Sequence, residues 1–330
     1  MPVIPTILAG NTLANGLVAT FKDAYAMGAK QNPMLSGCMS LGLPSTARQT
    51  PYAYFETAPY PRLTLKGDTT PFKGFASQTF TVINYPYEMA IGWHRDDRAD
   101  DQIQGLYQQA QQGGSHFATL HERVFFDIVN GSSSLLPTIP LAPDGAALWS
   151  ATDGSSAARF GVTGGNIISG SVASAAAVRA DFWEARQRFA SMLDTEGQPL
   201  WDEGFLAQGF TIVYATGNEE LFREAFLQGR TLAAANTATS NGAVTNTIIE
   251  SSTPIKLWST PRLSGNDWYV FANGAPHKPI FEQTREALVE TIHTADNSDH
   301  AAMTKEEWVQ WRARHGYGVF LPYGAIKVDV

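Results

Sequence analysis

The sequence predicts an α+β fold that combines an extended aromatic arm, one long helix and a lobe of alternating strands and helices. Strand-forming aromatic residues interspersed with prolines fill residues 51–93. Apolar residues then recur every three or four positions from Ile103 to Val129, which is the period of an amphipathic helix. After residue 174, helical and strand-like segments alternate, as they do in α/β lobes.

Composition narrows the classes of protein that fit this chain. Its 330 residues are 44% hydrophobic, which is enough for a packed core, and 29 glycines and 18 prolines predict much loop and strand. The net charge of −8 argues against a protein that grips nucleic acid by neutralising phosphates. The single cysteine, Cys38, excludes an intrachain disulfide and a multi-cysteine metal site. The N-terminus lacks the pattern of a signal peptide and no apolar run could span a bilayer, so we expect no membrane contact.

Residues 1–50 are predicted to form an N-terminal arm. A weak helical pattern from Leu13 to Met27 is followed by a segment punctuated by glycine, proline and serine. Few charges and little periodicity predict that this arm becomes ordered against something else and buries little against its own chain.

Residues 51–95 are predicted to form a long two-stranded extended loop. Its tip lies near Gly67, and Pro59, Pro61 and Pro86 remove hydrogen-bond donors, so its strands must be edge strands or bends. Because an isolated two-stranded ribbon is marginal in water, the loop must lie either on its own domain or on another subunit. Its aromatic density favours another subunit. The predicted interface residues are Tyr54, Phe55, Arg62, Lys66, Phe72, Lys73 and Phe75.

One helix is predicted to follow at once and to end at Asn130-Gly131. Gly113 and Gly114 cost it about 2 kcal/mol relative to alanine, but the apolar register continues through them. We therefore predict one helix bent at this pair, where Gly114 permits a kink or a close backbone approach. Acidic residues at the start of the helix complement its dipole and mark a hinge between loop and helix. The predicted hinge residues are Arg95, Asp96, Asp97, Asp100 and Asp101.

The remainder of the chain is predicted as a surface excursion followed by short regular elements. Residues 131–170 are low in charge and rich in serine and glycine, which is typical of a surface excursion with short strands. Ser174 is a good N-cap for the next helix. The predicted helices are 174–193, 219–228 and 304–314, the last from the capping box Thr304-Lys305-Glu306-Glu307. The predicted strands are 210–214, 247–250, 255–259, 268–272, 281–292, 316–320 and 325–328.

The candidate chemistry is sparse. Asp96, Asp97, Asp100 and Asp101, with His94 nearby, could bind a divalent cation, but the interleaved arginines make an ordinary acidic helix start the better interpretation. The glycine-rich run 161–166 lacks the lysine of a phosphate loop and is predicted to be a turn. His116 and His121 are five residues apart, which is poor spacing for joint metal ligation, so His121 is interpreted as a core-edge or interface histidine. We expect no catalytic, cofactor-binding or metal-binding residues, and no cofactor.

The segment around the acidic cluster resembles a known family. Arg95-Asp96-Asp97, Asp100-Asp101, Gly105-Leu106-Tyr107 and the closing Gly131 are similar to the run that opens the long helix of the Mu-like phage major head subunit family, the gpT type. The order of elements agrees over residues 50–330, including Asp194-Thr195-Glu196-Gly197-Gln198-Pro199-Leu200 after the second helix and the closing Gly316-Tyr317-Gly318.

This resemblance implies a Hong Kong 97-type phage capsid fold. The implied parts are an N-terminal arm (1–50), an extended loop or β-hairpin (51–95), a peripheral domain (96–173) with a spine helix (98–130), an axial domain (174–274) and a return to the peripheral domain (275–330). The resemblance does not fix the domain to which 131–173 belongs.

The resemblance also implies a function. It predicts the major capsid protein of a tailed double-stranded DNA bacteriophage, which is not an enzyme and self-assembles into hexamers and pentamers of an icosahedral shell. Such a protein assembles in the bacterial host cytoplasm, is a virion component, and encloses DNA without sequence-specific binding. Its expected partners are itself and portal, scaffolding and decoration proteins, and the presence of Met1 suggests a separate scaffold.

Two alternatives stay open at this point. An encapsulin-like nanocompartment shell protein would share the fold but enclose cargo enzymes. An unrelated α/β metal-dependent enzyme would use Asp96, Asp97, Asp100 and Asp101 at its metal.

Overall fold

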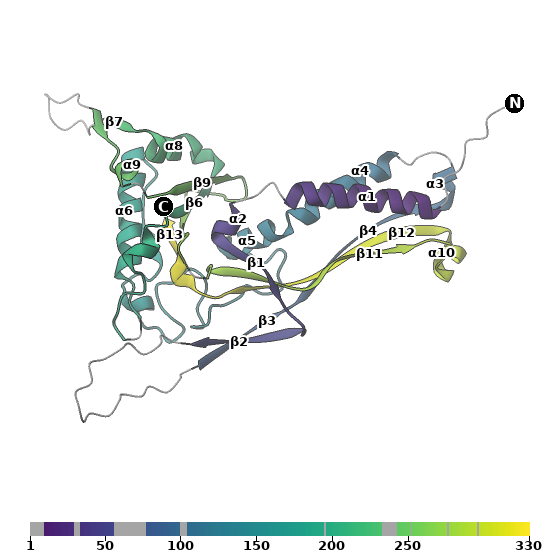
Figure 1. Cartoon of the computed structure of the whole chain (residues 1–330), viewed down its shortest axis with the longest axis horizontal. Helices are drawn as coiled ribbons and strands as arrows, with labels where there is room; N and C mark the ends of the chain where they lie inside the picture. The colour runs from purple at the N-terminus through teal and green to yellow at the C-terminus, as the bar shows by residue number, and fades with distance from the viewer. Residues whose placement is uncertain are drawn as a thin grey trace.

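The computed structural model describes residues 10–29, 34–55, 77–99, 104–194, 196–232, 243–251, 253–275, 277–295 and 297–330. Its described part is built on two larger sheets, one with the strand order β1-β11-β12-β4 and one with the order β5-β13-β10-β6-β9. Figure 1 shows an elongated molecule, in which the long strands of the first sheet run away from a lobe that contains the second sheet and helices α6 and α8. No helix within the described ranges is long and apolar enough to cross a membrane.

The four-stranded sheet is dominated by two long strands. In it β11 lies antiparallel to β12, β12 lies antiparallel to β4, and β1 adds to the edge parallel to β11. The strand predicted near 281–292 is confirmed. The strands of this sheet are β1 (Met39–Pro44), β4 (Tyr85–His94), β11 (Ile280–His293) and β12 (Glu306–Val319).

The helix predicted over 304–314 is wrong. The chain forms a short helix, α10 (Asp299–Thr304), and then enters β12. Every second residue is buried along the first half of this strand, including Val309, Trp311 and Ala313. That two-residue period fits a sheet with one covered face, and it outweighs the local capping-box signal at Thr304.

Helix α1 (Gly10–Ala29) covers the four-stranded sheet together with α4 (Gln104–Ala118), as Figure 1 shows. Leu13, Leu17 and Phe21 are fully buried, and the Phe21 ring stacks on Trp311 with 4.3 Å between centroids. Each such side chain contributes about 1.5–3 kcal/mol by burial. The helix predicted here is therefore confirmed, whereas the expectation that this segment buries little against its own chain is wrong for α1.

The single bent helix predicted after residue 103 is two helices. Helix α4 continues through Gly113 and Gly114, and the helix is interrupted at Thr119 before α5 (Leu120–Asn130) begins. A Cβ at Gly114 would clash with the carbonyl oxygen of Phe21. Gly114 thus permits the close approach of α1, which is one of the two roles predicted for it. The predicted kink at Gly113 and Gly114 is not formed, and the helix is interrupted five residues later, at Thr119. Gly131 ends α5 in the left-handed conformation, as predicted.

The five-stranded sheet forms the core of the lobe. All residues of its β6 and β10 strands are buried, and helices α6 (Ala175–Ser191) and α8 (Glu219–Leu227) contribute Phe182, Phe189 and Phe222 to the same core. The Ser174 hydroxyl accepts a hydrogen bond from the Ala177 amide at 3.2 Å, which confirms the predicted N-cap. The strands are β5 (Ile167–Ser169), β6 (Phe210–Ala215), β9 (Ile255–Thr260), β10 (Trp268–Ala272) and β13 (Ala325–Asp329).

Smaller elements connect these units. The strand predicted at 247–250 is wrong, because Asn246 caps a short helix there by accepting a hydrogen bond from the Ile248 amide at 3.1 Å. The segment 131–170, predicted as a surface excursion with short strands, contains turns and one short strand, β5, but it is not confined to the surface, because Leu148, Arg159 and Asn166 are buried. The remaining elements are α2 (Leu35–Cys38), α3 (Arg95–Ala99), η1 (Arg159–Gly161), α7 (Glu203–Leu206), η2 (Thr216–Asn218), β7 (Arg230–Leu232), β8 (Ala243–Thr245), α9 (Thr247–Glu250) and η3 (Pro322–Gly324).

The strand partners divide the chain differently from the boundaries implied by the resemblance. Strands β11 and β12 belong to the long sheet, but β13 crosses to the lobe and pairs with β10 and with β5. Ile326 and Val328 of β13 are fully buried in the lobe core. The lobe therefore takes its sheet from the segments before 174 and after 320 as well as from 174–274.

Candidate functional site at the root of the hairpin

A β-hairpin projects from the junction of the two units (Figure 1). Its strands β2 (Gln49–Phe55) and β3 (Ser77–Ile83) are antiparallel. The predicted two-stranded excursion is thus confirmed at its root. Tyr54 and Phe55 lie at the outer end of β2. The predicted tip and the other predicted interface residues, Arg62, Lys66, Phe72, Lys73 and Phe75, lie outside the described residues.

A network of hydrogen bonds ties this root to the long sheet. The Tyr52 hydroxyl donates to Gln283 Oε1 at 2.7 Å, and Gln283 Nε2 donates to Asn84 Oδ1 at 3.0 Å. Asn84 Nδ2 in turn donates to Ser45 Oγ at 2.9 Å and to the Ala47 carbonyl at 2.7 Å. The Gln283 and Asn84 side chains are buried, so a lost partner would leave an unpaired amide away from water. The network therefore favours one orientation of the hairpin.

Aromatic packing and two glycines complete the root. The Tyr52 ring stacks on Phe80 at 5.5 Å, and Phe80 packs against Phe281 at 6.2 Å. A Cβ at Gly316 would lie 2.8 Å from both the Asn84 and the Gln283 amide groups, and one at Gly318 would lie 2.7 Å from the Phe281 ring. The spacing Gly316-Tyr317-Gly318 therefore makes room on β12 for the network.

Sequence reasoning missed this network. Its members come from β2, from β11, from the segment after β1 and from the residue between β3 and β4, and more than 200 residues separate Tyr52 from Gln283. The one local signal was the pair of glycines in an otherwise strand-like segment, which often marks a close approach.

The acidic cluster near residue 95 is described in part. Arg95, Asp96 and Asp97 lie in the short helix α3, and α4 is described from Gln104, so the predicted join between the acidic cluster and the spine helix lies outside the described residues. Within this part, His94 Nδ1 lies 3.5 Å from an Asp96 carboxylate oxygen. Asp100 and Asp101 lie outside the described residues.

A second buried polar cluster joins α5 to the long sheet. His315 Nδ1 lies 2.7 Å from Glu282 Oε1, and His121 Nδ1 lies 3.0 Å from the Tyr317 hydroxyl. The His121 and His315 rings are 4.9 Å apart. Glu282 also accepts hydrogen bonds from the Gly42 amide and the Thr284 hydroxyl, each at 2.7 Å. His121 thus lies at the edge of the core, as interpreted from the sequence.

The protonation states in this cluster follow from burial and hydrogen bonding. Burial lowers the pKa of His121 to about 4, with the neighbouring His315 acting in the same direction. Burial would raise the pKa of Glu282, but hydrogen bonds, the largest from His315, outweigh it and hold that pKa below its usual value. At neutral pH the cluster therefore contains a carboxylate and an uncharged His121.

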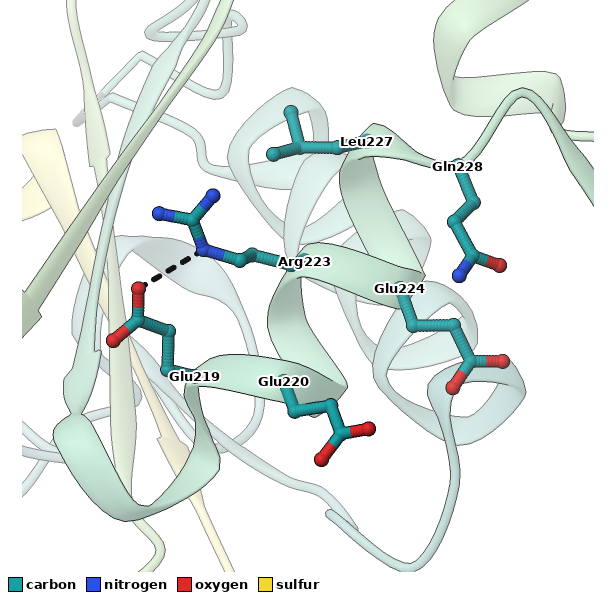
Figure 2. A pocket seen from close by; sticks show the side chains of 6 residues that line it. All are labelled: Glu219, Glu220, Arg223, Glu224, Leu227 and Gln228. Carbon is teal, nitrogen blue, oxygen red and sulfur yellow. Dashed lines mark hydrogen bonds and ion pairs between the residues drawn. The ribbon is translucent and has the colours of Figure 1, made fainter.

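The exposed face of α8 is a different kind of surface. Figure 2 shows Glu219, Glu220, Arg223 and Glu224 on successive turns, with Arg223 Nε 2.9 Å from Glu219 Oε1. Leu227 is 57% exposed at the end of this helix. Four of the six lining residues are charged, and such an open face suits contact with a neighbouring molecule better than enclosure of a small ligand.

Comparisons with known proteins agree on a family and a fold. The sequence matches the phage capsid protein family over residues 85–328 and the Mu-like prophage major head subunit gpT over residues 12–135. A search of curated proteins finds no match. The capsid of cyanophage P-SCSP1u is 11% identical with a TM-score of 0.56, and the match covers 88% of this chain and 86% of that one.

Two further solved structures show the same fold. The mature capsid of bacteriophage PhiM1 is 12% identical with a TM-score of 0.53, covering 90% of this chain and 87% of that one. A virus-like particle from Pyrococcus furiosus is 10% identical with a TM-score of 0.51, covering 94% and 98%. The α+β fold of Hong Kong 97 type implied by the sequence is therefore confirmed. Because the capsid family match covers more than half of its residues, this chain belongs to the phage capsid protein family.

Proposed function

We propose that this chain is the main shell subunit of a tailed double-stranded DNA phage, and that its copies form hexamers and pentamers of a closed icosahedral shell. The observation that carries this proposal is the hairpin, whose strands β2 and β3 form a ribbon outside the two larger sheets while its root is fixed by buried hydrogen bonds. A two-stranded ribbon gains stability by packing on a further surface. A neighbouring subunit supplies that surface.

The two units have separate roles in this proposal. The long sheet with α1, α4 and α5 forms the peripheral domain, and the hairpin of β2 and β3 forms the extended loop that reaches the next subunit. Residues 85–94, which the sequence assigns to that loop, are strand β4 of the long sheet. The lobe around α6 and α8 forms the axial domain near the five-fold and six-fold axes. Its charged α8 face, with Glu219 and Arg223, would lie at contacts between neighbours. Strand β13 joins this lobe, so the axial domain includes the end of the chain.

The negative net charge of the chain suits the wall of a container for nucleic acid. A net charge of −8 limits adhesion of the packaged genome to the wall, because phosphates would be attracted by the opposite sign. We include in the proposal assembly in the bacterial cytoplasm and contacts with portal, scaffolding and decoration proteins. We assign no catalytic role to the acidic residues near residue 95.

A protein nanocompartment is the second candidate. The match to a virus-like particle from Pyrococcus furiosus covers 98% of that chain, so the same elements suffice for a particle of that kind. The fold is common to both candidates, and the contents of the particle distinguish them.

Electron microscopy of the purified full chain tests the proposal. We expect closed particles with pentameric and hexameric clusters, and particles made in infected cells should hold double-stranded DNA. Shells filled with a protein cargo would favour the nanocompartment. A chain that stays monomeric at high concentration, with and without co-expressed scaffold, would contradict both candidates.

A further inference from the structure

We propose that His121, Glu282 and His315 form a binding site for a divalent first-row transition-metal cation, with Zn²⁺ as the preferred occupant. The three side chains come from α5, β11 and β12, and each offers a ligand atom within 4.8 Å of the other two. The site lies apart from His94, Asp96 and Asp97, because His94 is at the opposite end of β4 from the residue that pairs with His315. It concerns the subunit itself and does not depend on shell assembly.

Metal binding requires small shifts in the positions of the three ligand atoms. Ligand atoms of a tetrahedral zinc site are about 3.3 Å apart, since each lies about 2.0–2.1 Å from the metal. His315 and Glu282 are already closer than that, at 2.7 Å, so a metal would separate them slightly and draw His121 inward. A shift of about 1.5 Å in the His121 side chain is enough, and ring rotation of a half-buried histidine can supply it.

The ligand types select the class of metal. Two imidazoles and one carboxylate form a set that zinc and its first-row neighbours bind, whereas calcium and magnesium prefer oxygen ligands. Glu282 is 1% exposed and His315 is 7% exposed, so the cation would be bound inside the subunit. Buried carboxylates are usually paired with a cation or with hydrogen-bond donors.

The surroundings favour ligation at neutral pH. Metal binding requires uncharged imidazole and ionised carboxylate. The lowered pKa values of His121 and Glu282 keep both groups in these forms. The Tyr317 hydroxyl lies 3.0 Å from Nδ1 of His121 and gives this ring a hydrogen-bond partner. Such outer hydrogen bonds commonly orient ligating histidines.

A bound cation would link several elements at once. It would join the helix α5 to strands β11 and β12. Through the hydrogen bond from the Gly42 amide to Glu282, it would also brace β1, the strand that leads into the hairpin root. Occupancy would therefore stabilise the long sheet by mass action.

Metal titration of the tag-free full chain tests the site. After removal of metal with a chelator, one equivalent of Co²⁺ should bind and show the visible absorption of a tetrahedral complex, and Zn²⁺ should displace it. His121→Gln and Glu282→Gln should each weaken binding by more than about 100-fold, beyond what loss of an outer partner costs. His116→Gln is the matched control, because His116 is exposed and lies just before the break between α4 and α5.

The outcomes separate a metal site from a purely hydrogen-bonded cluster. Zn²⁺ should raise the unfolding temperature of the wild-type chain and of His116→Gln, but not that of His121→Gln, whose fold is checked by circular dichroism. Absence of the Co²⁺ absorption in the wild-type chain would overturn the proposal even if no variant folds. Equal binding by His116→Gln and His121→Gln would overturn it as well.

Discussion

The two sheets of this chain are stabilised in different ways. In the lobe, β6 and β10 are buried along their whole length and pack against aromatic residues of α6 and α8. In the long sheet, buried polar side chains, among them Gln283, Glu282 and Asn84, connect the strands to the hairpin and to α5. An apolar core supplies stability, whereas a satisfied polar network selects one arrangement. The hairpin, which we propose to contact a neighbouring subunit, is the part that buried polar groups hold in place.

The largest effect should come from the lobe core. Phe222 is fully buried, stacks on Tyr214 at 4.2 Å and meets the Trp268 ring edge-on. Phe222→Ala should lower the free energy of unfolding by about 3–5 kcal/mol, measured by urea denaturation. Leu227→Ala on the same helix, where the side chain is largely exposed, should change it by less than about 0.5 kcal/mol. Similar losses for both variants would show that α8 does not pack as described.

Acid should weaken the junction between α5 and the long sheet. His121 has a pKa of about 4 in the folded chain, so the unfolded chain binds a proton there first as pH falls from about 6.5. The stabilising contribution is therefore complete above about pH 6.5 and is lost as pH falls toward about 4, up to about 3 kcal/mol. Glu282, with its lowered pKa, adds a loss of the same sign at more acidic pH.

Denaturation at a series of pH values measures this effect on metal-free protein. The groups that face His121 are His315, Glu282 and Tyr317, and the lowered pKa of Glu282 adds to the profile at more acidic pH. His121→Gln should flatten the pH dependence between about 6.5 and 4. An unchanged profile in that variant would assign the acid sensitivity to other groups.

Two glycines of α4 should respond with opposite signs. Gly114→Ala should cost about 1–3 kcal/mol, because the new Cβ would meet the Phe21 carbonyl oxygen and lie 2.9 Å from the Ala24 Cβ. Gly105→Ala has open space at its Cβ and should stabilise the helix by about 0.5–1 kcal/mol. Thermal unfolding of the two variants side by side checks the contrast. A stabilising Gly114→Ala would mean that α1 does not lie against α4 at this point.

The smallest effect on stability should come from the hairpin root. Tyr52→Phe keeps the stack on Phe80 but removes the hydrogen bond to Gln283, at a cost of about 1 kcal/mol. A double-mutant cycle with Gln283→Met should show a coupling energy between the two positions. Strictly additive losses would indicate that the bond does not form in solution.

The same comparison explains what could be predicted from sequence. The elements that were predicted correctly follow local rules: Ser174 caps α6, the apolar run 210–215 forms a buried strand, and Gly131 ends α5. Two of the errors came where contacts between distant parts of the chain decide the structure. The alternating burial of residues along β12 outweighed the capping box at Thr304. At Gly114 the deciding contact is the backbone of α1, which lies too close for a side chain.

The candidate site was harder to predict because its parts are far apart in the chain. The approximate span of the hairpin could be read from aromatic residues and prolines, and its root strands formed as expected. Tyr52, Asn84 and Gln283 meet only in three dimensions, and no local pattern marks their contacts. The same is true of His121, Glu282 and His315, where the sequence offered only the unhelpful spacing of His116 and His121.

The most direct test of the central claim is the yield of closed shells from a chain whose hairpin is cut back to its root. Residues 56–76 are replaced by a short glycine-serine turn that leaves β2 and β3 intact, and particles are counted by sedimentation and electron microscopy. We predict that the shortened chain is a folded, soluble subunit with the wild-type unfolding temperature and forms no closed shells. The intact chain should form closed shells under the same conditions. Normal shells from the shortened chain would contradict the role assigned to the hairpin.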